Sequence, residues 1–300
     1  MIPAEFDYLA PTTLEEAVRL LAERGPEAKL LAGGHSLLPL MKLRLAAPRY
    51  VIDIGRLRGL SYIREEKGRI HIGALTTHAD VEDSALLRGK CPLLPDTAAY
   101  IGDVQVRNRG TIGGSLAHAD PAADYPAAIL ALDAEIVAAS SAGTRVIPAH
   151  EFFVDLLTTQ LRQGEILTEV RVPGLARRTG SCYLKLHQPA SGYALVGVAA
   201  RVTANRAGKM QEVAVGITGV GAKAYRAEAT ERALRGKKAT PKSLADAARH
   251  STQGVEPLSD LHASAEYRRE MTVVFVRRAL ERALAAAQAK RVPGRGRGKA

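Results

Sequence analysis

Residues 29–39 read Lys-Leu-Leu-Ala-Gly-Gly-His-Ser-Leu-Leu-Pro, an apolar strand candidate that runs directly into a glycine pair. A second stretch, residues 106–124, reads Val-Arg-Asn-Arg-Gly-Thr-Ile-Gly-Gly-Ser-Leu-Ala-His-Ala-Asp-Pro-Ala-Ala-Asp. A hydroxyl residue, Ser36 or Ser115, follows each pair. Glycine lets the backbone approach a ligand, and successive amides can converge on an anion. The two stretches therefore predict a phosphate or nucleotide cradle, with two ordinary tight turns as the alternative.

Other nucleotide and catalytic motifs fit the chain poorly. It has no G-x-x-x-x-G-K-[ST] phosphate loop and no G-x-S-x-G nucleophile elbow. A G-x-G-x-x-A pattern occurs at 219–224, but a Rossmann site would need a helix that starts in this loop, a second parallel strand and an acidic residue about 20 residues on. Here residues 236–241 and a helix follow instead, so we interpret the pattern as a strand-to-helix connection. His118, Asp120 and Asp124 lie close in sequence, yet the eight histidines form no metal-ligand pattern. No metal site and no hydrolytic chemistry is predicted.

The composition is that of a globular protein. The chain has 300 residues, 46% of them hydrophobic and 24% charged, which excludes a disordered protein. No apolar run is long enough to span a membrane, and the first residues lack the pattern of a secretory signal. Two cysteines, Cys91 and Cys182, exclude a disulfide scaffold and cannot supply the four ligands of an iron–sulfur cluster. We expect a cytoplasmic protein without a transmembrane segment.

Alternating strand and helix patterns divide the chain into parts. Thr13 and Glu16 form a candidate capping box, Thr77 is a candidate cap for a helix through Leu87, and Asp120 before Pro121 predicts a helix start. After residue 177, three strand-like segments precede three helical ones, which is typical of a separate α+β domain. The predicted parts are residues 1–55, 56–176, 177–289 and a tail at 290–300.

The tail accounts for part of the net charge of +11, because residues 290–300 hold five basic residues and no acidic one. A Gly/Arg segment without apolar residues cannot offset its ordering entropy, so disorder is predicted. A nucleic-acid or scaffold protein is an alternative function for so basic a chain. It leaves both glycine stretches unexplained, and no aromatic residue near the tail offers a stacking platform. We predict no nucleic-acid partner.

The two glycine stretches also carry a resemblance. Residues 32–39, residues 111–115 and the Asp120-Pro-x-x-Asp124 pattern closely resemble the flavin motifs of the FAD-binding subunit of the molybdenum hydroxylases. This family includes the carbon monoxide dehydrogenase medium chain and the xanthine dehydrogenase flavin domain. The resemblance covers about residues 3–288. It implies a vanillyl-alcohol-oxidase/MurB-like α+β fold, in which two α/β subdomains hold FAD and a C-terminal α+β domain with an antiparallel sheet covers it.

The resemblance also implies a set of FAD-contacting residues. In the first stretch these are Lys29, Leu31, Ala32, Gly33, Gly34, His35, Ser36 and Leu37. In the second they are Thr111, Ile112, Gly113, Gly114 and Ser115, joined by Ile101, Asp124, Leu167 and Lys185. Lys185 and Tyr193 are the expected neighbours of the isoalloxazine ring. The chain departs from the family at Ser115, where relatives often have Asn or Asp, and at Gln188, where they often have a basic residue. The second departure bears on the flavin potential and on access of the acceptor.

The resemblance further implies a function. FAD is bound non-covalently, a small subunit with two [2Fe-2S] clusters delivers electrons, and a large molybdopterin subunit oxidises the substrate. The chain passes electrons from FAD to an external acceptor, within an assembly expected to be a dimer of heterotrimers. A stand-alone flavin oxidoreductase of the same fold is the alternative. The substrate, whether carbon monoxide, an aldehyde, a purine or a heterocycle, stays open, because its pocket lies in another subunit.

Overall fold

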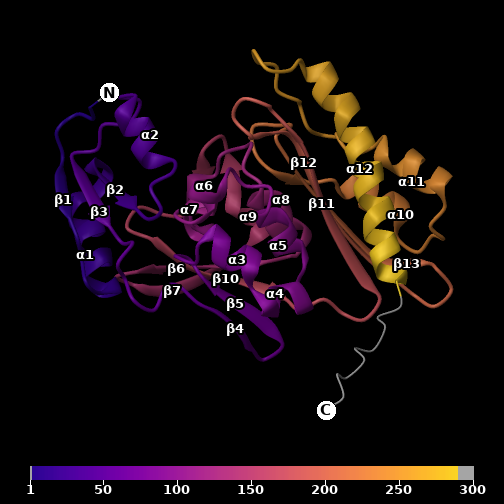
Figure 1. Ribbon diagram of the computed structural model, residues 1–300, viewed down its shortest axis with the longest axis horizontal. Helices are drawn as coiled ribbons and strands as arrows, with labels where there is room; N and C mark the ends of the chain where they lie inside the picture. The colour runs from indigo at the N-terminus through magenta and orange to yellow at the C-terminus, as the bar shows by residue number, and fades with distance from the viewer. Residues whose placement is uncertain (1, 290–300) are drawn as a thin grey trace, which may run out of the picture.

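The N-terminal part of the chain forms a parallel three-stranded sheet in the order β1-β3-β2. Parallel neighbours require crossover connections, and the helices between the strands supply them. This unit lies at one end of the molecule, at the left of Figure 1. Its elements are β1 (Asp7–Leu9), α1 (Leu14–Arg24), the 3-10 helix η1 (Gly25–Glu27), β2 (Ala28–Leu31), α2 (Leu37–Lys42) and β3 (Tyr50–Asp53).

This computed structural model describes residues 2–289, so the tail predicted at 290–300 lies outside the described residues. Within them, no helix is both long enough and apolar enough to cross a bilayer.

The middle of the chain builds a five-stranded antiparallel sheet in the order β4-β5-β10-β6-β7. Short helices lie on one of its faces and close the largest apolar core of the molecule. The strands are β4 (Ile63–Glu66), β5 (Arg69–Gly73), β6 (Glu135–Ser140), β7 (Gly143–Pro148) and β10 (Ile166–Pro173). The other elements are α3 (His78–Asp83), α4 (Ala85–Lys90), α5 (Leu93–Ala98), α6 (Val104–Arg107), α7 (Ile112–His118), α8 (Tyr125–Ala131), α9 (Ala149–Phe152), β8 (Phe153–Asp155) and β9 (Thr158–Thr159).

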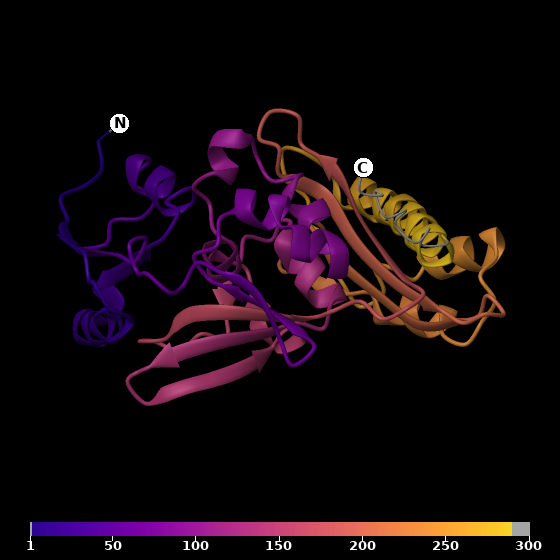
Figure 2. The same ribbon diagram turned by 60° about the horizontal axis from the view of Figure 1, so that its bottom comes forward.

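The last part of the chain is a four-stranded antiparallel sheet, β11-β12-β13-β14, followed by three helices. Helices of the middle part lie between the two large sheets, and α12 covers the outer face of the second one (Figures 1 and 2). The arrangement agrees with the predicted α+β class. The elements are β11 (Thr179–His187), β12 (Ala194–Ala204), β13 (Met210–Thr218), β14 (Tyr225–Arg226), α10 (Glu228–Leu234), α11 (Pro241–Ala248) and α12 (Ala265–Gln288).

Glycines let helices touch both faces of this C-terminal sheet. A Cβ on Gly216 would lie 2.0 Å from the Ala127 carbonyl oxygen of α8, and one on Gly180 would lie 2.1 Å from the Ala283 oxygen of α12. Asp133, directly after α8, accepts hydrogen bonds from Arg201 and Arg226 of the sheet. Helix α8 is therefore fixed to the C-terminal sheet along its length and at its end.

Four local predictions need correction. Glu16 accepts from the backbone amide of Thr12 rather than Thr13, so the capping box is not reciprocal. The Thr77 helix stops at Asp83, because the extended backbone of Ser84 interrupts it and starts α4. Asp120 caps a tight turn by accepting from the Ala122 amide, and the helix begins only at Tyr125.

The fourth correction concerns residues 219–224. These residues connect β13 to the short antiparallel strand β14, so they form a hairpin rather than a direct strand-to-helix connection. Gly219 has φ +82°, and a Cβ there would lie 2.5 Å from the Ala194 carbonyl oxygen. Close backbone packing therefore explains this glycine without a nucleotide.

Candidate functional site

A cavity of about 580 Å³ lies where the three parts of the chain meet. Both glycine stretches line it, the N-terminal unit and the middle part contribute most of the wall, and Lys185 of β11 reaches it from the C-terminal sheet. Its size falls in the range of small-molecule and cofactor sites. Of the predicted site residues, Leu31 and Ile112 do not line the cavity, and all the others do, Tyr193 included.

The first glycine stretch presents unpaired backbone amides to this cavity. Strand β2 ends at Leu31, and α2 begins at Leu37. Among the described residues, the amides of Gly33, Gly34, His35 and Ser36 have no hydrogen-bond acceptor, and the Ser36 hydroxyl makes no capping bond. Gly34 has φ +79°, a conformation that favours glycine. A run of free amides beside a cavity forms a concave binding site for an anion.

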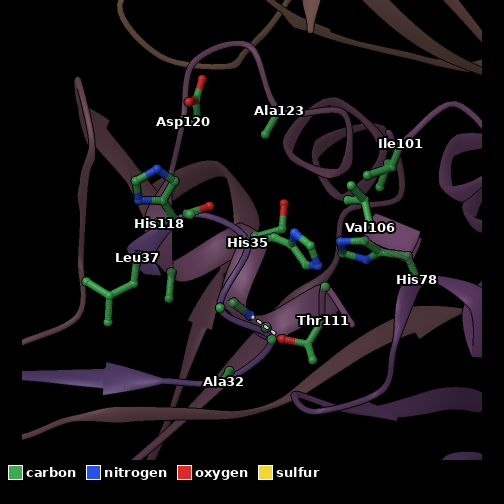
Figure 3. Close-up of a pocket in the computed structure, with 18 of the residues that line it drawn as sticks. Ala32, His35, Leu37, His78, Ile101, Val106, Thr111, His118, Asp120 and Ala123 are labelled. Carbon is green, nitrogen blue, oxygen red and sulfur yellow. Dashed lines mark hydrogen bonds between the residues drawn. The ribbon is translucent and has the colours of Figure 1, made fainter. Parts of the chain in front are cut away.

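The two glycine stretches touch through their backbones. A Cβ on Gly33 would lie 2.2 Å from the Arg109 carbonyl oxygen and 2.8 Å from Cα of Gly110. Ala32, which precedes Gly33, also approaches the second stretch: its Cβ lies 3.8 Å from the position that a Cβ on Gly114 would take. The stretches therefore form two facing walls of one cavity, and Figure 3 shows Ala32 of the first stretch and Thr111 of the second close together at its base.

The second stretch contributes in a different way from the first. Ile112 and Gly113 donate to the carbonyl oxygens of Thr76 and Ala74, at 3.0 and 2.9 Å. The Gly114 amide is 3.2 Å from the Thr111 hydroxyl oxygen, which caps α7. Ser115 donates to the Thr111 carbonyl oxygen at 3.0 Å. Most amides of this stretch are thus already used, so it offers a rigid wall, whereas the first stretch offers free amides.

Residues 74–78, which hold this second wall, were not predicted from the sequence. The His78 amide donates to the Gly110 oxygen at 2.9 Å, and Thr77 bridges to Thr111. A Cβ on Gly110 would lie 2.5 Å from Nε2 of His78, so only glycine fits against this imidazole. Ala74 and His78 also line the cavity. This pairing joins segments far apart in sequence, and no local motif signals it.

His78 is the most unusual polar group in the wall. Its side chain makes no hydrogen bond among the described residues, and its buried Nδ1 has no partner. Burial, with smaller effects from His35 and Arg107, lowers the pKa of His78 to about 4. In Figure 3 the imidazoles of His35 and His78 lie side by side above Thr111. The cavity wall therefore holds a neutral imidazole near neutral pH.

We expect His78 to make the protein less stable in mild acid. The unfolded chain takes up a proton at His78 near its ordinary pKa of 6.5, whereas the folded protein does so only near 4. As the pH is lowered from about 6.5 to about 4, the free energy of unfolding of the unsubstituted chain should therefore fall by about 3 kcal/mol more than that of His78→Gln. Urea unfolding followed by circular dichroism measures the difference. His150→Gln, at an exposed histidine, is the control and should follow the unsubstituted chain.

A buried ion pair lies at the end of the cavity nearest the C-terminal sheet. Nζ of Lys185 donates to Oδ2 of Asp124 at 2.9 Å and to the Tyr100 carbonyl oxygen at 3.0 Å. The Tyr183 hydroxyl donates to Oδ1 of Asp124 at 2.5 Å. The Lys185 and Asp124 side chains are 2% and 6% exposed. An ammonium has three N–H donors, so Lys185 keeps one for a ligand in the cavity.

Apolar contacts and a tyrosine complete this end of the cavity. Ile101 and Leu167 line it, and Leu167 also belongs to the apolar core of the middle part. Tyr193 lies between β11 and β12 and is 45% exposed. His118 and Asp120 line the cavity with Asp124, but no group of metal-ligating side chains is found in residues 2–289.

Comparison with known proteins identifies the family. Residues 4–175 match the model described as the FAD binding domain in molybdopterin dehydrogenase. The chain belongs to this flavoprotein family. Residues 181–283 match a second model, the CO dehydrogenase flavoprotein C-terminal domain. The resemblance stated from the two glycine motifs is thereby confirmed.

Relatives of this flavoprotein match it over nearly its whole length. The carbon monoxide dehydrogenase medium chain of Hydrogenophaga pseudoflava is 42% identical, with 95% of this chain and 99% of the relative covered. The 6-hydroxypseudooxynicotine dehydrogenase complex subunit alpha of Paenarthrobacter nicotinovorans is 40% identical, with 95% and 96% covered. A solved structure of the Hydrogenophaga pseudoflava carbon monoxide dehydrogenase superposes with a TM-score of 0.93 at 43% identity, covering 95% and 99%. The predicted fold is confirmed.

Proposed function

We propose that this chain is the FAD-binding subunit of a molybdenum hydroxylase of the carbon monoxide and xanthine dehydrogenase type. The observation that carries the proposal is the run of free amides at residues 33–36, facing a rigid second wall across one cavity. These amides suit a diphosphate, because each N–H is a donor without another partner. Flavin-binding relatives of the same length and fold support the assignment.

The residues of the cavity divide the work of holding the cofactor. The amides of residues 33–36 would bind the diphosphate, and the wall at 111–115 would fix its position. Lys185 would donate its remaining N–H to the ring system, while Ile101 and Leu167 would exclude water. FAD held non-covalently in this way supplies a store for two electrons. The Lys185 ammonium would place a positive charge beside the bound flavin, and Asp124 would balance part of that charge.

Two further subunits belong to this proposal. The two cysteines of the chain cannot supply the four ligands that an iron–sulfur cluster normally takes, so in this proposal electrons enter from clusters in a partner. We assign these to a small [2Fe-2S] subunit and the substrate chemistry to a large molybdopterin subunit, in a dimer of heterotrimers. The relatives belong to enzymes with different substrates, so the chain itself does not define the substrate. We place the assembly in the cytoplasm, consistent with two free thiols.

Gentle affinity purification of the full chain from its native host tests the proposal. We expect FAD, iron and molybdenum in the eluate, together with two co-purifying subunits. FAD without metals or partners, combined with turnover by the isolated chain, would instead indicate a stand-alone flavin oxidoreductase. An eluate without FAD that also takes up none when FAD is added would contradict both functions.

A further inference from the structure

Tyr183 is a buried tyrosine that the proposed function does not use. Tyr183 and Lys185 lie two residues apart on β11 and therefore project from the same face of the sheet. Their side chains meet at Asp124, which directly precedes α8 in the middle part of the chain. Each carboxylate oxygen of Asp124 thus has its own donor, the phenol on Oδ1 and the ammonium on Oδ2.

The surrounding packing fixes the phenol in place. A Cβ on Gly197, on the neighbouring strand β12, would lie 2.5 Å from the Tyr183 hydroxyl oxygen. The Tyr100 ring meets the Tyr183 ring edge to face, with centroids 5.6 Å apart. Tyr100 also accepts a hydrogen bond from Lys185 through its carbonyl oxygen. Tyr100 therefore contacts both donors to Asp124, one through its ring and the other through its carbonyl oxygen.

We propose that Tyr183 is a positioning residue of the cofactor site: its hydroxyl keeps Asp124 ionised and turned toward Lys185, so that the ammonium presents its free N–H to the cavity. The inference rests on the proposed function, since it assumes that FAD fills the cavity. Tyr183 itself does not line the cavity and acts only through Asp124.

The charges around Asp124 explain why the hydroxyl matters. Burial raises the pKa of Asp124, whereas Lys185 and the Tyr183 hydroxyl act in the opposite direction. The other titratable groups that face this carboxylate are the phenols of Tyr125 on α8 and Tyr193 on the β11–β12 loop. Without the Tyr183 hydroxyl, Asp124 would take up a proton at a higher pH. The Lys185 charge beside the cofactor would then be uncompensated.

Tyr183→Phe, in the full chain purified with its partner subunits and FAD, tests the inference. The flavin midpoint potential is measured by spectroelectrochemistry from about pH 5 to about pH 9. On acidification, the flavin potential of the variant should rise above that of the unsubstituted protein. The rise should begin at a pH about one unit or more above the pH at which it begins in the unsubstituted protein. FAD affinity, measured by flavin fluorescence, should weaken on the order of tenfold. Tyr225→Phe removes a partly buried hydroxyl, which donates to the Ser251 carbonyl oxygen, and should leave both quantities unchanged.

Gly197→Ala provides a second variant in case Tyr183→Phe does not fold. The added methyl group displaces the phenol without removing it, and the same change in the potential profile is expected. If Tyr183→Phe or Gly197→Ala binds FAD and its potential follows the same pH profile as that of the unsubstituted protein, the inference is overturned. A weaker FAD affinity alone would not support the inference, because a merely structural role of Tyr183 predicts that loss too. Failure of the unsubstituted chain to take up FAD would overturn the proposed function, and this inference with it.

Discussion

Gly33→Ala should reduce the FAD content of the purified chain by at least about tenfold. The added methyl carbon would lie 2.2 Å from the Arg109 carbonyl oxygen, and this neighbour is backbone that cannot rotate away. The two walls must separate to accept it, which moves the free amides of residues 33–36 relative to the second wall. Binding that depends on converging backbone donors is lost when they are misplaced by about 1 Å. FAD content is measured from the absorbance ratio of flavin to protein.

Gly89→Ala is the matched control for this substitution. Gly89 lies in α4 with a negative φ, and a Cβ there would meet nothing within 4 Å. The control should retain the FAD content of the unsubstituted chain. A Gly33→Ala protein with normal FAD content would show that the two walls can separate without loss of FAD. FAD binding would then not depend on the amides of residues 33–36 being held against the second wall.

Asp124→Asn should lower the free energy of unfolding by about 3–5 kcal/mol, because it leaves the buried ammonium of Lys185 without a countercharge. Replacing Lys185 by Met in the same protein removes that charge and should restore most of the lost stability. FAD affinity should not recover in the double variant, since the donor to the cofactor is gone. Urea unfolding and FAD titration on the same three proteins measure the two effects separately.

Glu23→Gln serves as the comparison for an exposed ion pair. Glu23 accepts a hydrogen bond from Arg19 one helical turn earlier, and the side chains of Glu23 and Arg19 are 46% and 59% exposed. Solvent screening should limit the loss of stability there to about 1 kcal/mol or less. A loss of that small size at Asp124 as well would mean that Lys185 finds another partner and that the pair does not hold the cavity together.

Local signals in the sequence account for most of the fold. The Gly-Gly pair after residues 29–32 correctly predicts a strand that ends in a tight loop, and the strand and helix segments after residue 177 match β11–β13 and α10–α12 closely. These predictions depend on apolar periodicity and turn residues, which act within a few positions of the chain. The Asp120-Pro121 pair misled because the same residues stabilise an isolated turn as readily as a helix start.

The candidate site was only partly predictable, because its chemistry depends on tertiary contacts. The two glycine motifs identified both walls of the cavity but not which backbone amides are free to bind a ligand. The amides of Ile112 and Gly113 donate to carbonyl oxygens within residues 74–76. That pairing also brings His78 into the cavity wall. Lys185 and Asp124 were identified only through the family resemblance, and their shared partner Tyr183 carries no sequence signal, since a buried aromatic residue on a strand is ordinary core.

The contact between Gly33 and Arg109 constrains how this protein can be recombined with its relatives. A chimera that takes the N-terminal unit from one parent and the middle part from another packs two backbones of different origin against each other. The fit there is tight, because a Cβ added to Gly33 would lie only 2.2 Å from the Arg109 carbonyl oxygen. A crossover between residues 55 and 106 therefore separates two halves that must match in shape. Crossovers that keep residues 28–115 from a single parent avoid this mismatch, so shuffled libraries built in that way should retain flavin more often.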